Sequence, residues 1–313
     1  MRKIPLALAL AALSVPGSAA EAPKGEVSVL YAGSLVNLME KDLGPAFAQA
    51  SGYSYQGEGK GSVALARMIK DGLRQPDVFV SADPKVNDLL MGKANGDKVR
   101  WYGLLFRNEM VVGYNPKSRF ADRFAKAAAG ELPFYEALEG KGLRLGRTDP
   151  KLDPKGYRTI ILFELAEKYY RQPGLTAKIL GAPGNPEQVF PEEQLEARLE
   201  TGQLDAGVFY RNEAEERGLA YIALPRKINL GDPALDKTYA EADYVDAAGK
   251  TFRGGAIVYS ITVPENAPHR QGALAFVEYV MSDAGRGILR KHGLASVKPV
   301  FTGEAPAEVR AAK

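Results

Sequence analysis

An alternation of short apolar strands with longer amphipathic helices is the feature that most constrains how this chain can fold. Strands are predicted at residues 26–31, 77–80, 109–114, 206–210 and 256–263, and helices at 35–50, 62–71, 159–170, 192–201, 271–281 and 284–292. This alternation is typical of α/β proteins, in which helices cover largely parallel sheets. The chain has 313 residues, more than one ordinary core needs, so two domains are expected.

Two segments lack this periodicity. Residues 225–255 contain several Gly, Pro and Asp residues, and we predict irregular cover between two strands. The end of the chain, residues 301–313, continues a stretch rich in Ala, Pro and Glu and is predicted to be a mobile tail.

The N-terminus has the pattern of a secretory signal peptide over residues 1–20. Arg2 and Lys3 supply the positive start, an apolar run covers residues 4–15, and small residues at 18–20 provide a cleavage site before Glu21. An uncleaved anchor is the alternative, but the run is too short to span a bilayer stably. We therefore expect an exported protein.

Cysteine is absent from the chain, so neither a disulfide nor a lipid-bearing cysteine at the signal junction is available. An exported protein with neither a membrane anchor nor a disulfide is expected in a bacterial periplasm. The formal net charge is +3, and two of the positive charges belong to the predicted signal peptide. A balance so close to neutral argues against a nucleic-acid partner, and we expect a monomer.

Two glycine-serine pairs follow predicted strands and open helices. Gly33-Ser34 comes after the first strand, and Gly61-Ser62 begins the helix at 62–71. A serine hydroxyl at such a junction caps the helix, and the glycine lets the backbone approach a ligand closely. Free N–H groups at a helix N-terminus also attract anions. Plain capping without a ligand remains the alternative for both serines.

Two further segments carry polar groups at positions where a ligand can be bound. Asp153 lies in a loop with two Asp-Pro dipeptides directly before the helix at 159–170, and Tyr157 follows it. Asp153 is suited to capping that helix or to forming a turn. Tyr210 ends the strand at 206–210, where its hydroxyl either donates to a ligand or belongs to an ordinary core tyrosine.

These segments, in this order, resemble the molybdate- and tungstate-binding proteins of ABC transporters, most closely the tungstate/molybdate subgroup. Matching stretches at 108–118, 224–231, 258–264 and 267–269 extend the resemblance from Val27 to Leu294. It implies a two-lobed periplasmic-binding-protein fold of type II, with mixed sheets flanked by helices and two hinge crossings. Lobe I is expected at 24–112 plus 265–300 and lobe II at 113–264, with crossings near 112–115 and near 264.

The resemblance also implies roles for individual residues. Ser34 and Ser62 match the two oxyanion-binding serines, with Gly33 and Gly61 beside them, and Tyr210 matches the tyrosine of the ligand cleft. Tyr157 is expected to line the same site. The expected ligand is molybdate or tungstate, the expected partner is an ABC transporter permease, and no cofactor is expected.

Asp153 matches a carboxylate that binds the metal directly in the archaeal-type subgroup, which makes it a candidate metal ligand. Those proteins take a second carboxylate from a glutamate just before the tyrosine, where this chain has Phe209. We therefore expect four-coordinate binding, because the carboxylate of Glu213 would have to double back to replace it. Asp153 is then expected to turn away and cap its helix, or to be offset by cations from the following list: Arg147, Lys155 and Arg158.

Other classes of protein remain as alternatives. A binding protein for sulfate, phosphate, an organic anion or Fe(III) would share the fold. An enzyme is disfavoured, because the chain contains no P-loop, G-x-S-x-G or dinucleotide motif. The two histidines, His269 and His292, have no metal-ligand or triad-like neighbours in the sequence, so we predict surface or capping roles for them.

Overall fold

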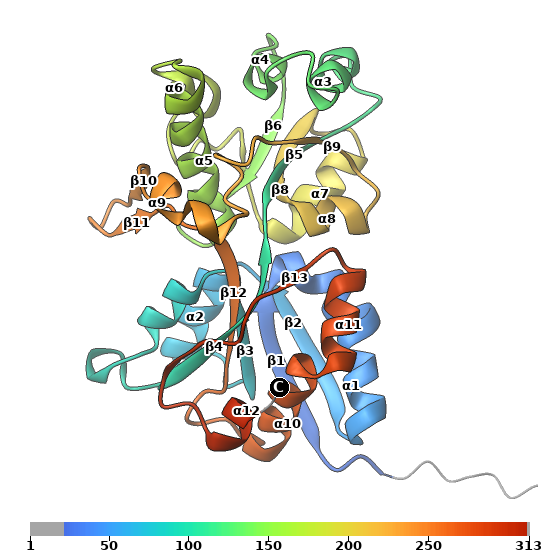
Figure 1. The fold of residues 1–313 in the computed structure, drawn as a ribbon, viewed down its shortest axis with the longest axis vertical. Coiled ribbons are helices and arrows are strands. Elements are labelled where there is room, and N and C mark those ends of the chain that lie inside the picture. Colours follow the sequence, from blue (N-terminus) through green and yellow to red (C-terminus); the bar gives the residue numbers. More distant parts are fainter. Residues whose placement is uncertain (1–21, 312–313) are drawn as a thin grey trace, which may run out of the picture.

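The structure, a computed structural model, describes residues 22–311. Figure 1 shows two lobes, one above the other, with extended chain running between them. Each lobe contains its own sheet, one of seven strands and one of five. We call the part built on the seven-stranded sheet lobe I and the part built on the five-stranded sheet lobe II. The predicted signal peptide, residues 1–20, lies outside the described residues.

The sheet of lobe I is mixed. It contains β1 (Glu26–Ala32), β2 (Ser54–Lys60), β3 (Val78–Ser81), β4 (Trp101–Asn108), β12 (Ile257–Thr262), β13 (Ala295–Ser296) and β14 (Phe301–Gly303). Their order is β13-β4-β12-β3-β1-β2, and β14 pairs with β4. β1 runs parallel to β2 and β3, whereas β12 runs antiparallel to β3 and β4. Helices cover both faces, which explains why β3 is buried along its whole length.

The helices of lobe I are α1 (Gly44–Ser51), α2 (Ser62–Lys70), α10 (Arg270–Met281), α11 (Asp283–Lys291) and α12 (Ala307–Ala311), with short 3-10 turns η1 (Gly33–Leu35), η3 (Pro84–Leu89) and η4 (Lys93–Asn95). The helix predicted over 35–50 is present as one unbroken helical run, but it is not α-helical throughout. A π-helical segment, η2 (Leu38–Leu43), leads directly into α1. Pro45 lies in the first turn of α1, where its missing N–H group cannot continue the preceding ladder of hydrogen bonds.

Lobe II is built on a second mixed sheet. Its strands are β5 (Met110–Tyr114), β6 (Leu145–Thr148), β7 (Val189–Phe190), β8 (Ala206–Tyr210) and β9 (Ala220–Ala223), in the order β7-β6-β8-β5-β9. Its helices are α3 (Ala121–Ala128), α4 (Phe134–Leu138), α5 (Pro154–Tyr170), α6 (Leu175–Leu180), α7 (Glu192–Glu200) and α8 (Arg211–Glu216). α5 is buried on nearly every side, which makes it the central helix of the lobe.

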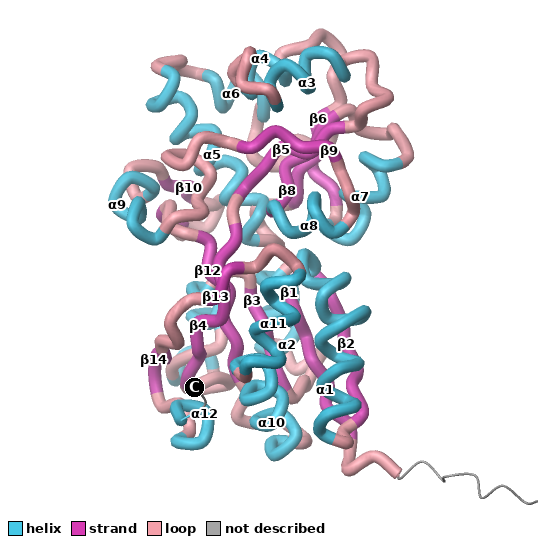
Figure 2. Tube along the Cα trace, turned by 45° about the vertical axis from the view of Figure 1, so that its right-hand side comes forward, coloured by secondary structure: helices cyan, strands magenta, loops and turns pink. Residues whose placement is uncertain are grey.

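The two crossings between the lobes lie earlier in the chain than we predicted. β5 pairs only with β8 and β9 of lobe II, so the first crossing falls at Glu109, between β4 and β5. β12 pairs with β3 and β4 of lobe I, so the second crossing falls just before Ile257 rather than near 264. Hydrogen bonds from Met110 N–H to the Asn229 carbonyl and from Ile257 N–H to the Leu230 carbonyl tie both crossings to the same segment. Figure 2 shows β12 at the junction of the two lobes.

Two segments are more regular than the sequence indicated. Within 225–255 the chain forms η5 (Pro233–Leu235), α9 (Asp236–Tyr239) and a hairpin of β10 (Asp243–Val245) with β11 (Thr251–Arg253). The tail is not mobile through residue 311, because β14 pairs with β4 and Val309 of α12 is fully buried. Within residues 22–311, each helix is too short or too polar to cross a membrane.

Candidate functional site

Ser34 and Ser62 both lie where lobe I meets lobe II. Ser34 belongs to η1, directly after β1, and Ser62 begins α2. Both are buried, and the Ser34 hydroxyl shares a 2.8 Å hydrogen bond with the Tyr259 hydroxyl. The Ser62 hydroxyl accepts a 3.1 Å bond from the Ala82 N–H, which leaves its own proton able to donate. Neither serine caps its helix with its side chain, so that prediction was wrong.

The N-terminus of α2 is capped by lobe II. Val63 and Ala64 donate their N–H groups to the carbonyl oxygen of Leu152, each at 3.1 Å. Gly61 permits this approach, because a Cβ atom there would lie 2.6 Å from the Leu152 oxygen. Two of the N–H groups that we expected to be free to bind an anion are therefore already hydrogen-bonded within the protein.

Asp153 caps α5, as predicted. Its Oδ1 accepts a 2.9 Å hydrogen bond from the Lys155 N–H, and Pro154 occupies the first helical turn. Its other oxygen, Oδ2, is buried without a hydrogen-bond partner among the residues that the structure describes. Burial raises the pKa of Asp153, although the nearby Lys155 ammonium opposes the rise. A buried oxygen of this kind is costly unless it binds something, so it marks a polar site.

Tyr210 and Tyr157 are joined through Arg158 and Asp83. Arg158 donates to the Tyr210 hydroxyl at 2.8 Å and to the Ala82 carbonyl of lobe I at 2.7 Å. Its guanidinium also lies 3.3 Å from Asp83, which accepts a 2.8 Å bond from the Tyr157 hydroxyl. Because Tyr210 accepts a bond from Arg158, its hydroxyl proton remains able to donate to a ligand. Tyr157 instead holds the two lobes together.

Lys155, Glu192 and Glu213 form a buried cluster that the sequence analysis did not identify as a unit. The Lys155 ammonium is completely buried and lies 2.5 Å from Glu213 and 3.3 Å from Glu192. The second oxygen of Glu192 accepts the Gly33 N–H at 3.1 Å, so this side chain links lobe II to the glycine beside Ser34. Glu213 does double back, contrary to our expectation, and accepts the Tyr210 N–H at 2.7 Å.

The electrostatics of this cluster are shaped by burial. Burial raises the pKa of Glu192 well above its usual range, and the neighbouring Asp153 adds to the rise. Burial lowers the pKa of Lys155, but Glu213 and Glu192 outweigh it and hold this pKa above its usual value. A charged lysine therefore lies beside Glu192, whose raised pKa favours the protonated carboxyl group.

Comparisons with known proteins assign the chain to a family. The family described as bacterial extracellular solute-binding protein matches residues 27–295. The chain belongs to this family. It is 39% identical, over 79% of its length and 74% of the relative, to a proposed ABC transporter molybdenum-binding protein of Haloferax volcanii. It is 31% identical to the molybdate/tungstate-binding protein WtpA of Pyrococcus abyssi, over 82% of this chain and 79% of that one.

A solved structure agrees with the fold of this solute-binding protein. The periplasmic molybdate-binding protein of Azotobacter vinelandii superposes with a TM-score of 0.58 at 16% identity, covering 87% of this chain and all of that one. The predicted two-lobed α/β fold is therefore confirmed. The family and the named relatives are solute-binding proteins of transporters rather than enzymes, and such proteins function with a membrane permease and an ATPase.

Two residues that we considered near Asp153 have other roles in this solute-binding protein. Arg147 is fully buried and donates to the carbonyl groups of Pro183 and Ala182, each at 2.8 Å, so it does not offset Asp153. Phe209 packs in the second apolar cluster of lobe II, and its ring centre lies 5.8 Å from the Lys155 ammonium. It supplies no oxygen to the site.

His292 is the C-cap residue of α11, which is one of the two roles predicted for it, and its side chain is largely buried. One ring nitrogen lies 2.8 Å from Glu216 of lobe II and the other lies 3.0 Å from Asp42 of lobe I. It therefore bridges the lobes at the end of α11. His269 lies beside Asp77, which accepts its backbone N–H at 2.6 Å, and its side chain is half exposed.

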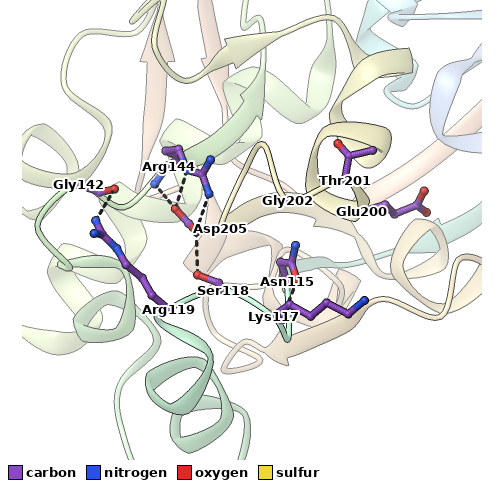
Figure 3. A pocket seen from close by; sticks show the side chains of 10 residues that line it. All are labelled: Asn115, Lys117, Ser118, Arg119, Gly142, Arg144, Glu200, Thr201, Gly202 and Asp205. Atoms are coloured by element: carbon purple, nitrogen blue, oxygen red, sulfur yellow. Dashed lines mark hydrogen bonds and ion pairs between the residues drawn. The ribbon is translucent and has the colours of Figure 1, made fainter.

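A hollow of about 630 Å³ lies on lobe II, away from these residues. Residues of the β5–α3 connection and of the turn before β8 are among those that line it (Figure 3). Its polar groups bond to one another. Asp205 accepts two bonds from the Arg144 guanidinium, each at 3.0 Å, and one from Ser118 at 2.8 Å, while Arg119 donates to the Gly142 carbonyl. Hydrogen bonds thus hold this part of lobe II together, and none of the predicted site residues lines the hollow.

Proposed function

We propose that this solute-binding protein binds molybdate or tungstate between its two lobes and delivers the ion to an ABC importer. One observation carries the proposal. The hydroxyl groups of Ser34, Ser62 and Tyr210 are all buried where the two lobes meet. Asp153, which faces Gly61, has a buried oxygen with no hydrogen-bond partner within residues 22–311. Contacts link the three hydroxyl groups in a continuous series through Tyr259, Arg158 and Ala82.

The chemistry of these groups suits a small oxyanion. Hydroxyl protons of serine and tyrosine bond to the outer oxygens of a tetrahedral ion, and bonds to a charged partner are the stronger kind. The buried cations Lys155 and Arg158 are already paired with carboxylates, so hydrogen bonds from the hydroxyl groups carry the recognition of the ion. The names of two relatives, one for molybdenum and one for molybdate and tungstate, support the same choice of ligand.

We further propose that the ion keeps four-coordinate geometry. Both oxygens of Glu213 are already bonded, to Lys155 and to the Tyr210 N–H, and Phe209 offers none. Asp153 is then left as the one candidate metal ligand among the carboxylates that we considered. A single carboxylate does not complete a six-coordinate shell, so hydrogen bonds rather than metal–protein bonds hold the ion.

Thermal unfolding with a panel of ions tests the ligand. At one hundred times its dissociation constant, a bound ion adds about 2.7 kcal/mol to the free energy of unfolding. We expect molybdate and tungstate to raise the midpoint temperature, and sulfate, phosphate and Fe(III) to leave it unchanged. A shift with sulfate, phosphate or Fe(III) but not with molybdate or tungstate would contradict the proposal and identify the alternative ligand.

We also propose that the mature protein acts in the bacterial periplasm, after removal of residues 1–20. Its membership of an extracellular solute-binding family supports export. Mass spectrometry of the periplasmic fraction should find a chain that begins at Glu21. A chain that retains Met1 in the membrane fraction would contradict the cleavage.

A further inference from the structure

A second polar feature lies next to the proposed site, in a cavity of about 40 Å³ between the lobes. Lobe I contributes α2 and η3 to its wall, and lobe II contributes the loop before α5 and the β10–β11 hairpin. Figure 1 shows the hairpin and α2 on the same side of the molecule. The space exceeds what one water molecule needs by this measure, which is about 10–15 Å³.

Four cations line this cavity, two from each lobe. Arg67 and Lys85 belong to lobe I, and Lys151 and Lys250 to lobe II. All four are exposed, and none has a carboxylate within 4.0 Å among the residues described by the structure. Lys85 donates to the Arg253 carbonyl at 3.5 Å, and Lys250 lies over the Phe252 ring at 5.0 Å, but these partners carry no negative charge. The four cations therefore form a site of unbalanced positive charge.

The acidic groups near the cavity offset this charge only in part. Asp246 lines the cavity, but one of its oxygens accepts the N–H groups of Ala248 and Lys250, each at 2.9 Å, and so shapes the hairpin turn. Asp88 also lies in the field of Lys250 and Lys85, and burial raises its pKa. Asp83 also acts on Asp88 but is paired with Arg158. Among the described residues that line the cavity, Asp246 is thus the one acid beside four cations, which leaves a net positive field there.

The cavity adjoins the proposed anion site. Val63 and Tyr157 line it, and their chain neighbours Ser62 and Arg158 belong to the site. Tyr157 stacks on Phe252 of the hairpin with ring centres 4.4 Å apart, and its hydroxyl is bonded to Asp83. The hairpin, which the sequence analysis did not predict, thus brings Lys250 to the edge of the site.

We propose that this cavity is an outer docking site that captures the incoming small inorganic dianion before it reaches Ser34 and Ser62. The inference rests on the proposed function, since it concerns the entry of the same ion. Cations from both lobes attract a dianion at a distance, and its charge relieves their mutual repulsion as the lobes approach. The site therefore raises the association rate constant and leaves the dissociation rate constant of the fully bound ion unchanged.

Rapid filtration with radiolabelled molybdate at low ionic strength tests the inference. The double variant Lys151→Gln/Lys250→Gln should bind about tenfold more slowly, within the range reported for electrostatic steering, while a chase with unlabelled ion gives the same dissociation rate constant. Arg67→Gln/Lys85→Gln should behave alike. The difference should vanish at about 1 M salt, where screening acts over about 3 Å. Lys93→Gln/Lys117→Gln is the matched control, because it removes the same charge from exposed positions elsewhere.

Three outcomes would overturn the docking site: association rates equal to wild type, a decrease that persists at high salt, or an equal decrease in the control. Circular dichroism of each variant establishes that it is folded before its rates are compared. If the wild-type protein itself fails to bind molybdate or tungstate, the proposed function fails instead. The two failures are therefore distinguished by the wild-type experiment alone.

Discussion

Replacing Glu192 tests the link between Lys155 of lobe II and Gly33 of lobe I. Glu192→Ala removes the acceptor of the Gly33 N–H, which lies at 3.1 Å, and the contact with Lys155, which lies at 3.3 Å. A neutral hydrogen bond contributes about 1 kcal/mol and one with a charged donor about 2 kcal/mol. Lys155 keeps Glu213 at 2.5 Å, so the full cost of an unpaired buried charge does not apply. The free energy of unfolding should fall by about 3 kcal/mol.

Glu192→Gln should be far milder. Burial raises the pKa of Glu192 well above its usual range, so the folded protein favours the protonated side chain over a wider pH range than the unfolded chain does. Over that range a neutral amide of the same shape replaces a neutral acid and still accepts the Gly33 N–H. We expect a loss of about 1 kcal/mol or less. Glu187, which is exposed, supplies the control pair Glu187→Ala and Glu187→Gln.

The pH dependence adds a second measure of the same reasoning. Above the unfolded pKa of about 4.3, the folded chain holds a proton on Glu192 that the unfolded chain has lost. The stabilising contribution of this proton is complete below that pKa and is lost as pH rises through the folded pKa. The advantage of wild type over Glu192→Gln should therefore shrink with rising pH in urea unfolding followed by circular dichroism. If Gln proves as damaging as Ala, Glu192 is ionised and the argument from burial is wrong.

Three further predictions concern the ligand. Ser34→Ala and Ser62→Ala should each weaken molybdate binding by about 1–3 kcal/mol in calorimetry while the protein stays folded; normal binding by both would place the anion elsewhere. Gly61→Ala puts a Cβ atom 2.6 Å from the facing carbonyl, so small-angle scattering should detect separated lobes and affinity should fall, whereas Gly184→Ala meets nothing within 4 Å and should change neither. X-ray absorption of the loaded protein should show four oxygens at the metal; two additional oxygens from carboxylates such as Asp153 would refute four-coordinate binding.

The alternation of strands and helices predicted most of the fold because those elements are set by local patterns. β8 begins and ends where the sequence indicated. α2, α7 and α10 differ from the prediction by one residue at one end, and α11 by one residue at each end. The elements that were missed are too short to show a periodic pattern. Each strand of the β10–β11 hairpin has three residues, and so does β14, which depends on pairing with the distant strand β4.

Single residues of the candidate site were predicted from the sequence, but the contacts between them were not. Ser34, Ser62, Asp153 and Tyr210 stand at the ends of elements, which a sequence shows directly. The partners of Lys155 are 37 and 58 residues away, and no pattern links such separations. One signal was available. Residues 160–163 are all apolar, which indicates a helix that is buried on several sides. Lys155 lies in the first turn of that helix and is buried with it.

That buried lysine gives a physical reason for the phenyl ring at position 209. Lys155 already contacts two carboxyl groups, and burial raises the pKa of Glu192 even in its presence. A third carboxylate at 209 would enter a region with no further cation to offset it, since Arg158 is taken up by Tyr210, Ala82 and Asp83. Phe209 instead packs with Leu195 and Leu199. Glu213 and Glu192 both contact Lys155. On the proposed function, the hydroxyl groups rather than a pair of carboxylates are therefore expected to recognise the ion.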